Sequence, residues 1–291
     1  MEEVHRTKSV LIAGATGYIG RHVCKGFLDS GYNVFTYNRS GQIACYVSGR
    51  EVNASELVSY FDVVVNCARP HWLEFSPEDI AQIEFKLLQT LDTFAANNAT
   101  KIHTSGVWLF GHATSDDLLH FRLHPLKVVE PDVRTINDAI QKQWHIVYCP
   151  SLVYGGENCQ LQRIVQSLAN QSIQVALPSE GHNQYVHVHD VARFYLLLAQ
   201  EQPTERQHFI AEPQGYSPEE FAQLLLKAQV VKSVEEVNWA QFESNNGIAA
   251  VEIEKLNLVL PISPLFKTKE LVCRYIKKQG SIRAFDESTL R

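Results

Sequence analysis

Residues 9–20 read SVLIAGATGYIG, and this stretch decides the fold that we predict. It opens with a short apolar run at residues 10–13, which is typical of a buried strand. Three glycines follow in the spacing G-x-x-G-x-x-G, at Gly14, Gly17 and Gly20. Apolar residues then recur every four positions, on one face of a helix, at Ile19, Val23 and Phe27. The stretch therefore predicts a strand, a glycine turn and a helix.

Such a glycine turn between a strand and a helix is typical of a dinucleotide-binding site. One glycine makes the tight turn, one lets the backbone approach a pyrophosphate, and one allows the helix to pack closely on the strand. The helix N-terminus then offers free N–H groups and a partial positive charge to the phosphates. A glycine-rich turn without a ligand is the alternative. The contacts that we predict are Gly14, Thr16, Gly17, Tyr18, Ile19 and Gly20.

The end of the second strand, predicted at residues 33–37, indicates which dinucleotide is bound. A carboxylate at this position would accept a hydrogen bond from the ribose 2′-hydroxyl of NAD. The sequence continues instead with Asn38, Arg39 and Ser40. A guanidinium suits a 2′-phosphate, because its N–H groups form a fixed fork. We therefore predict NADP as the cofactor, with these three residues among its contacts, against the alternative of a solvated surface arginine.

Composition excludes several classes of partner. The chain has 291 residues, of which 45% are hydrophobic and 20% charged, and its net charge is -6, so neither nucleic acid nor an anionic membrane is an expected partner. No apolar run is long enough to span a bilayer, and the first eight residues lack the apolar region of a signal peptide. The six cysteines contain no C-x-x-C pair, which favours reduced thiols and a cytoplasmic location. His120 and His124 lack a third ligand, so we predict no metal site.

The rest of the chain alternates strand and helix patterns in its first half. Apolar or β-rich runs predict strands at residues 62–67, 101–104, 145–149 and 207–211, and helical patterns span 77–96 and 190–200. The buried stripe of the first of these helices is predicted at Ile80, Ile83, Leu87, Leu91 and Phe94. Further on, Ser217 and Glu220 have the spacing of a capping box. Continuous apolar strands separated by helices indicate a parallel sheet that is covered on both faces.

Taken together, five motifs resemble the extended short-chain dehydrogenase/reductase family, in its NAD(P)-dependent epimerase/dehydratase group. GATGYIG at 14–20 resembles the glycine motif, and DVVVNCA at 62–68 resembles the strand D-V-V-x-x-x-A. TSGVWLFG at 104–111 resembles S-S-x-x-V-Y-G, PSLVYG at 150–155 resembles R-P-x-x-V-Y-G, and YVHVHDVA at 185–192 resembles F-x-H-V-x-D-x-A. The five motifs occur in the family's order, and the resemblance covers nearly the whole chain.

The resemblance implies an α/β fold, namely a Rossmann doubly wound parallel sheet with a smaller C-terminal α/β substrate lobe. The NADP-binding domain would comprise residues 1–155, with 187–211 returning to it, and residues 156–291 would form most of the substrate lobe. Ala68 would join the cofactor contacts. The family also implies a homodimer, formed through a long helix such as 77–96.

Catalysis in the family rests on Y-x-x-x-K, whose tyrosine exchanges a proton while hydride moves to or from the nicotinamide. No tyrosine of this chain has a lysine four positions later. If Asp138 is the counterpart of the family's helical glutamate, then Arg134 stands at the lysine position and Glu130 at the tyrosine position. Arg134 could still hold ribose hydroxyls but stays charged, and Glu130 beside an arginine would be ionised. A loop carboxylate without a role is the alternative for Glu130.

Two further residues are candidates for the active site. Counting back from Gly111 puts Gly106 at the family's Ser/Thr position, with Ser105 directly before it. Ser105 could donate a hydrogen bond to a substrate carbonyl, or it could satisfy the backbone at a strand end. Tyr154 of the V-Y-G motif would shape the pocket rather than donate a proton.

The sequence thus leaves two functions open. The first is an NADP-dependent oxidoreductase or epimerase that acts on a small polar or sugar-like substrate with a non-standard catalytic set. The second is a non-catalytic NADP-binding redox sensor or regulatory protein, because the usual proton relay is missing.

Overall fold

The computed structural model describes residues 6–289, and the side chains of 6–281. The chain forms two compact units that interleave along the sequence. The first unit runs to Leu109 and resumes at Lys127–Tyr148 and Val191–His208. The second unit comprises Phe110–Leu126, Cys149–Asp190 and the chain from Phe209 onward.

Among the described residues, eight strands of the first unit form one sheet in the order β12-β7-β6-β5-β1-β2-β3-β4. β2, β1, β5 and β6 are parallel to one another, while β3 and β4 are antiparallel additions at one edge. The elements are β1 (Ser9–Ala13), α1 (Tyr18–Asp29), β2 (Asn33–Tyr37), β3 (Ile43–Cys45), β4 (Glu51–Val52), β5 (Phe61–Asn66), α2 (Pro77–Phe94), β6 (Ala95–Gly106), α4 (Val133–Gln141), β7 (His145–Cys149), α6 (Val188–Glu201) and β12 (Gln207–Phe209).

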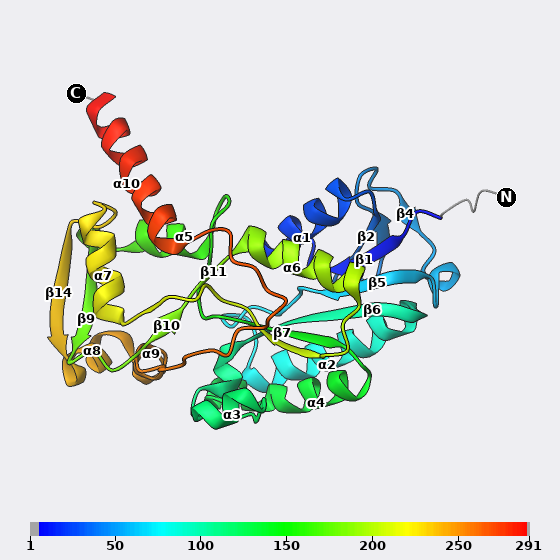
Figure 1. Cartoon of the computed structure of the whole chain (residues 1–291), viewed down its shortest axis with the longest axis horizontal. Coiled ribbons are helices and arrows are strands. Elements are labelled where there is room, and N and C mark those ends of the chain that lie inside the picture. The colour runs from blue at the N-terminus through cyan, green and yellow to red at the C-terminus, as the bar shows by residue number, and fades with distance from the viewer. Residues whose placement is uncertain (1–5, 290–291) are drawn as a thin grey trace. The chain divides into compact units, whose positions relative to one another are not determined.

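Helices cover both faces of this sheet. α1 and α6 lie on one side and α2 and α4 on the other (Figure 1). Gly26 of α1 lies against Ala192 on α6, and the Thr135 hydroxyl of α4 donates to the Ala81 carbonyl of α2 at 3.4 Å. From β1 the chain passes to β2 on one side, and β5 follows on the other. β1 and β5 therefore form the switch point, outside whose carboxyl ends such sheets bind ligands.

The predicted fold class is confirmed, because the sheet is dominated by parallel strands and covered by helices on both faces. The strands predicted at 33–37 and 145–149 match β2 and β7, and the helix predicted at 77–96 is α2. The short strands β3 and β4 were not predicted, since runs of two or three residues carry no readable periodicity. The prediction at 101–104 covers only the end of β6.

The second unit is built from short strand pairs and helices. β8 pairs with β11, β10 with β13, and β9 with β14. Its elements are α3 (Ser115–Leu119), β8 (Val153–Tyr154), α5 (Gln160–Ser167), β9 (Ser172–Leu177), β10 (Asn183–Gln184), β11 (Val186–His187), β13 (Gly215–Tyr216), α7 (Pro218–Lys227), β14 (Ser233–Asn238), α8 (Trp239–Asn246), α9 (Ile248–Glu254) and α10 (Val272–Thr289).

The division of the chain differs from the expected boundary at residue 155. The segment Phe110–Leu126 belongs to the second unit, where Phe121 stacks on Phe209 with ring centroids 5.0 Å apart. The Leu126 side chain packs against Gly111 in the same segment, at a distance that leaves no room for a Cβ there.

The capping box predicted at Ser217 and Glu220 is present at the start of α7. The Ser217 hydroxyl accepts from the Glu220 N–H at 3.1 Å, and the Glu220 carboxylate accepts from the Ser217 N–H at 2.8 Å. We expect Ser217→Ala to lower the free energy of unfolding by about 1 kcal/mol in urea titrations. The control is Ser167→Ala, since that hydroxyl only donates to a carbonyl of its own helix. Equal losses in both variants would contradict a capping role.

Candidate dinucleotide site

The glycine turn after β1 is packed so closely that side chains are excluded. Gly14 has a φ of +78°, and a Cβ there would lie 2.6 Å from both the Ala68 nitrogen and the Cys67 carbonyl carbon. A Cβ at Gly20 would collide with the Gly14 carbonyl oxygen. Gly17 donates its N–H to that oxygen at 2.9 Å. The glycine pattern therefore joins β1, α1 and the end of β5 in one compact turn.

The first turn of α1 keeps its backbone donors available. Gly17 is the N-cap residue, and no side chain caps the helix. The first N–H groups of a helix have no partner within it, and no acidic residue stands in this first turn. Thr16 is exposed, and Tyr18 and Ile19 are half-buried. The N-terminus of α1 thus carries an uncompensated partial positive charge that suits a phosphate.

The residues after β2 form an exposed turn stabilised by its own side chains. The Asn38 carboxamide oxygen accepts from the Ser40 N–H at 3.0 Å and from the Ser40 hydroxyl at 2.7 Å. Among the described residues, no hydrogen bond or ion pair holds the Arg39 guanidinium. Asn38 and Ser40 therefore shape the turn, and Arg39 is the group in it that can reach an anion.

Buried polar residues hold the end of β5 in place. The Asn66 carboxamide oxygen accepts from the Ala68 N–H at 3.0 Å, and its nitrogen lies 3.1 Å from His103 Nδ1 on β6. Burial, and next the charge of Arg69, lowers the pKa of His103 to about 3, so the imidazole is neutral and accepts this hydrogen bond. This network fixes Ala68 against Gly14, at the predicted cofactor position.

Ser105 lies on β6 next to this network. The neighbouring Thr104 hydroxyl lies 2.7 Å from the Tyr195 hydroxyl of α6 and donates to Cys67 Sγ at 3.4 Å. Since side chains alternate along a strand, Ser105 faces the opposite side of the sheet. Its side chain is half-buried, and its role as a substrate contact stays a prediction.

The other three catalytic candidates are not gathered around Ser105 by any described contact. Glu130 is exposed, and Arg134 is exposed on α4 with its guanidinium carbon 4.5 Å from the centre of the Phe85 ring. Tyr154 lies in the second unit, fully buried against His187 and Tyr275. Burial chiefly raises its pKa, so it remains protonated at neutral pH. Tyr154 is therefore a packing residue.

A charged cluster that the sequence reasoning missed lies directly after Ala68. Arg69 binds the Glu84 carboxylate of α2 at 2.7 Å and the Asp132 carboxylate before α4 at 2.6 Å. Glu84 and Asp132 are almost fully buried, whereas the Arg69 side chain is 31% exposed. Burial, despite the opposing charge of Arg69, raises the pKa of Glu84 to about 7 and also raises that of Asp132. The sequence signal that could have revealed this cluster is the position of Glu84, which lies four residues from both Ile80 and Leu88 on one face of the helix.

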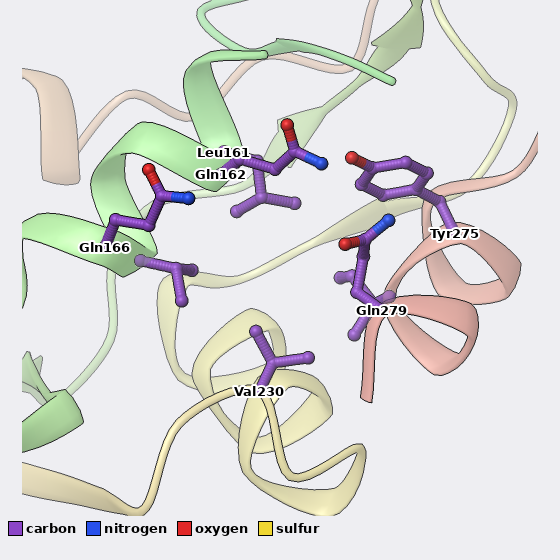
Figure 2. Close-up of a pocket in the computed structure, with 8 residues that line it drawn as sticks. Leu161, Gln162, Gln166, Val230, Tyr275 and Gln279 are labelled. Carbon is purple, nitrogen blue, oxygen red and sulfur yellow. The ribbon is translucent and has the colours of Figure 1, made fainter. Parts of the chain in front are cut away.

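The second unit contains a cavity of its own between α5, α10 and the segment after α7. Figure 2 shows the side chains of Gln162, Gln279 and Tyr275 pointing toward one another across it. The Tyr275 hydroxyl lies 3.3 Å from Cys159 Sγ. Apart from Gln166, the rest of the cavity wall is aliphatic, and it carries no charged side chain. None of the predicted site residues lines it.

Neither a metal-ligand cluster nor a membrane-spanning helix occurs in the described part of the chain. It contains no group of three or more His, Cys, Asp or Glu side chains placed to hold a metal ion. No helix within it has both the length and the apolar composition needed to cross a bilayer.

A parallel sheet with a close-packed glycine turn at its switch point defines a Rossmann-type, dinucleotide-binding class of protein. The sequence model of the NAD dependent epimerase/dehydratase family matches residues 10–127. This part of the chain therefore resembles that family, and the resemblance to extended short-chain dehydrogenases/reductases is confirmed. No curated protein of similar sequence was found.

Several solved structures share the fold at low sequence identity. Human epimerase family protein SDR39U1 (isoform 2) with NADPH is 14% identical, with a TM-score of 0.71 over 94% of this chain and 99% of that one. MoeE5 in complex with UDP-glucose and NAD is 15% identical, with a TM-score of 0.67 over 95% and 99%. UDP-N-acetylglucosamine 4-epimerase from Bacillus cereus is 14% identical, with a TM-score of 0.66 over 95% and 99%. At this identity the likeness concerns the fold.

Proposed function

We propose that this protein is an NADP-dependent oxidoreductase or epimerase with a non-standard catalytic set. The observation that carries the proposal is the glycine turn, which brings the N-terminus of α1 and Ala68 together without any intervening side chain. The similar fold of a human protein solved with NADPH supports the same cofactor class. A cytoplasmic location and a homodimer through α2 remain predictions.

Two parts of the cofactor, the pyrophosphate and the 2′-phosphate, have matching groups in the first unit. The N–H groups at the start of α1 bind the pyrophosphate, and the Arg39 guanidinium binds the 2′-phosphate of the adenosine half. When bound, NADP supplies a nicotinamide carbon that gives or accepts hydride. The Ser105 hydroxyl donates a hydrogen bond to the substrate oxygen, and with no tyrosine at the relay position the proton comes from water.

Cofactor preference tests the proposal directly. We expect NADPH to bind more tightly than NADH, and Arg39→Ala to weaken NADPH about tenfold while leaving NADH unchanged, because a charge-assisted hydrogen bond is lost. Fluorescence titration measures both affinities, and Arg163→Ala on α5 is the control for an exposed arginine elsewhere. Tighter binding of NADH by the native protein would overturn the choice of NADP.

The alternative function is a non-catalytic NADP-binding sensor or regulatory protein. It is favoured by the exposed positions of Glu130 and Arg134, which leave no proton relay around Ser105. Turnover separates the two functions, since a sensor binds NADPH without oxidising it in the presence of any carbonyl compound.

A further inference from the structure

Two tryptophans stand at the carboxyl edge of the sheet, next to the residues assigned to cofactor and substrate. Trp72 lies four positions after Ala68, in the segment between β5 and α2, and Trp108 lies three positions after Ser105. Their ring centroids are 6.1 Å apart with the planes at 42°. We call this pair the tryptophan platform. It belongs to the first unit and borders the switch point at which such sheets bind ligands.

The charged cluster of Arg69, Glu84 and Asp132 contacts the tryptophan platform through Arg69. The Arg69 guanidinium carbon lies 4.8 Å from the centre of the Trp72 ring, within the range of a cation–π contact. Arg69 is itself fixed by Glu84 on α2 and by Asp132 before α4. Trp72 is thus oriented by a rigid support, yet its residue surface remains 40% exposed.

The segment that carries Trp72 exposes further apolar side chains, and its neighbouring arginine is already paired. Leu73 is 90% exposed and Phe75 is 36% exposed in the same segment. Arg69 faces two carboxylates, and one Asp132 oxygen is buried without a hydrogen-bond partner. Glu74 adds an exposed carboxylate in the same segment. The carboxylates would therefore disfavour an anionic group here, whereas the exposed apolar and aromatic side chains offer a contact surface to a neutral ring.

We propose that the tryptophan platform binds the substrate, and that the substrate is a neutral aromatic ketone or aldehyde, or the corresponding alcohol. This inference rests on the proposed function and replaces the sugar-like class expected from the resemblance. In the reduction, the carbonyl carbon gains one hydride from NADPH and the oxygen gains one proton from water, which gives the alcohol and NADP⁺. The aromatic ring stacks on Trp72 and Trp108 while Ser105 donates to the oxygen.

Ligand-observed NMR titrations on the full chain with saturating NADP⁺ test the substrate class without turnover. The ligands are acetophenone, cyclohexyl methyl ketone, 4-acetylbenzoate and UDP-glucose. We expect acetophenone to bind most tightly, with the saturated ring about threefold or more weaker because it lacks the stacking interaction. Tighter binding of UDP-glucose or of 4-acetylbenzoate would overturn the proposal.

Three variants locate the acetophenone site. Trp72→Ala is expected to weaken acetophenone about tenfold, Trp72→Phe to retain most of the affinity, and all NADP⁺ affinities to stay within about twofold. Val58→Ala, which truncates an exposed apolar residue elsewhere in the first unit, serves as the control. Unchanged acetophenone affinity in Trp72→Ala would overturn the proposal. If the native protein did not bind NADP⁺, the proposed function itself would be overturned. The two outcomes are therefore distinguishable.

Discussion

Gly14→Ala is expected to abolish tight NADPH binding and to destabilise the first unit strongly, whereas Gly31→Ala should retain NADPH binding and destabilise only mildly. Both glycines have positive φ angles, +78° and +82°. A left-handed conformation costs an alanine about 1–2 kcal/mol at either position. Only at Gly14 would the new Cβ also meet backbone, 2.6 Å from the Ala68 nitrogen, while nothing lies within 4 Å of a Cβ at Gly31. Comparing the two variants therefore separates the cost of a left-handed backbone from the cost of the steric clash at Gly14.

The expected loss for Gly14→Ala is about 2–5 kcal/mol of unfolding free energy, since overpacking adds to the strain. NADPH affinity should fall at least about tenfold, because moving the turn breaks charge-assisted hydrogen bonds to the pyrophosphate. Urea unfolding and fluorescence titration measure the two effects. Gly31→Ala should retain native NADPH affinity. If both variants bound NADPH like the native protein, the glycine turn would not be the phosphate site.

The glycine turn could be predicted from the sequence because its requirements are local. A backbone position with positive φ and no room for a Cβ admits only glycine. The spacing of Gly14, Gly17 and Gly20 therefore predicts the geometry of the turn. The strand β7 was predicted for a similar reason, since its largely apolar run reflects burial on both faces, whereas β2 was predicted from its β-rich composition.

The buried face of α2 was predicted wrongly in part. The sequence favoured Ile83 and Leu87 as stripe residues, but Ile83 is 39% exposed and Leu87 is half-buried. Glu84 and Leu88 take their places in the core. A hydrophobic pattern ranks an isoleucine above a glutamate, and it contains no information about a partner fifteen residues away. The ion pair with Arg69 is a tertiary interaction that reverses the local preference.

The catalytic candidates depended on counting from motifs, which fixes a position along the chain but not the direction of a side chain. Arg134 does stand on a helix near the sheet, yet its guanidinium packs over Phe85. Tyr154 lies in the motif that the resemblance identified, yet its hydroxyl is buried without a hydrogen-bond partner in the second unit. Only the packing of neighbouring elements determines these orientations.

Arg69→Leu is expected to destabilise the protein strongly at pH 8 and much less at pH 5. The variant leaves Glu84 and Asp132 buried without their positive partner. Removing one member of a buried ion pair costs about 3–5 kcal/mol. At lower pH the two carboxylates take up protons and become neutral, so the uncompensated charge disappears. Arg122→Leu is the control, since Arg122 pairs with Asp116 and Asp117 at the exposed surface and its loss should change little.

The unfolding free energy of the native protein should also depend on pH, through the titration of Glu84. Its pKa of about 7 lies above the ordinary value of 4.5, so between these pH values the folded state keeps a proton that the unfolded state has released. The contribution of Glu84 is therefore complete below pH 4.5 and is lost as the pH rises through 7. Glu84→Gln removes this titration. The difference in unfolding free energy between native protein and variant should then fall by on the order of 3 kcal/mol from pH 4 to pH 8.

Urea unfolding of both proteins across this range provides the measurement, and taking the difference cancels the other buried acids and histidines. A difference independent of pH would mean that Glu84 is already ionised below pH 5, with Arg69 compensating its charge completely. Arg69→Leu removes this compensation, so its destabilisation should depend on pH in either case, and equal losses at pH 5 and pH 8 would mean that burial does not raise the pKa of the two carboxylates. The comparison of the native protein with Glu84→Gln therefore tests whether burial outweighs the attraction of Arg69 at this cluster.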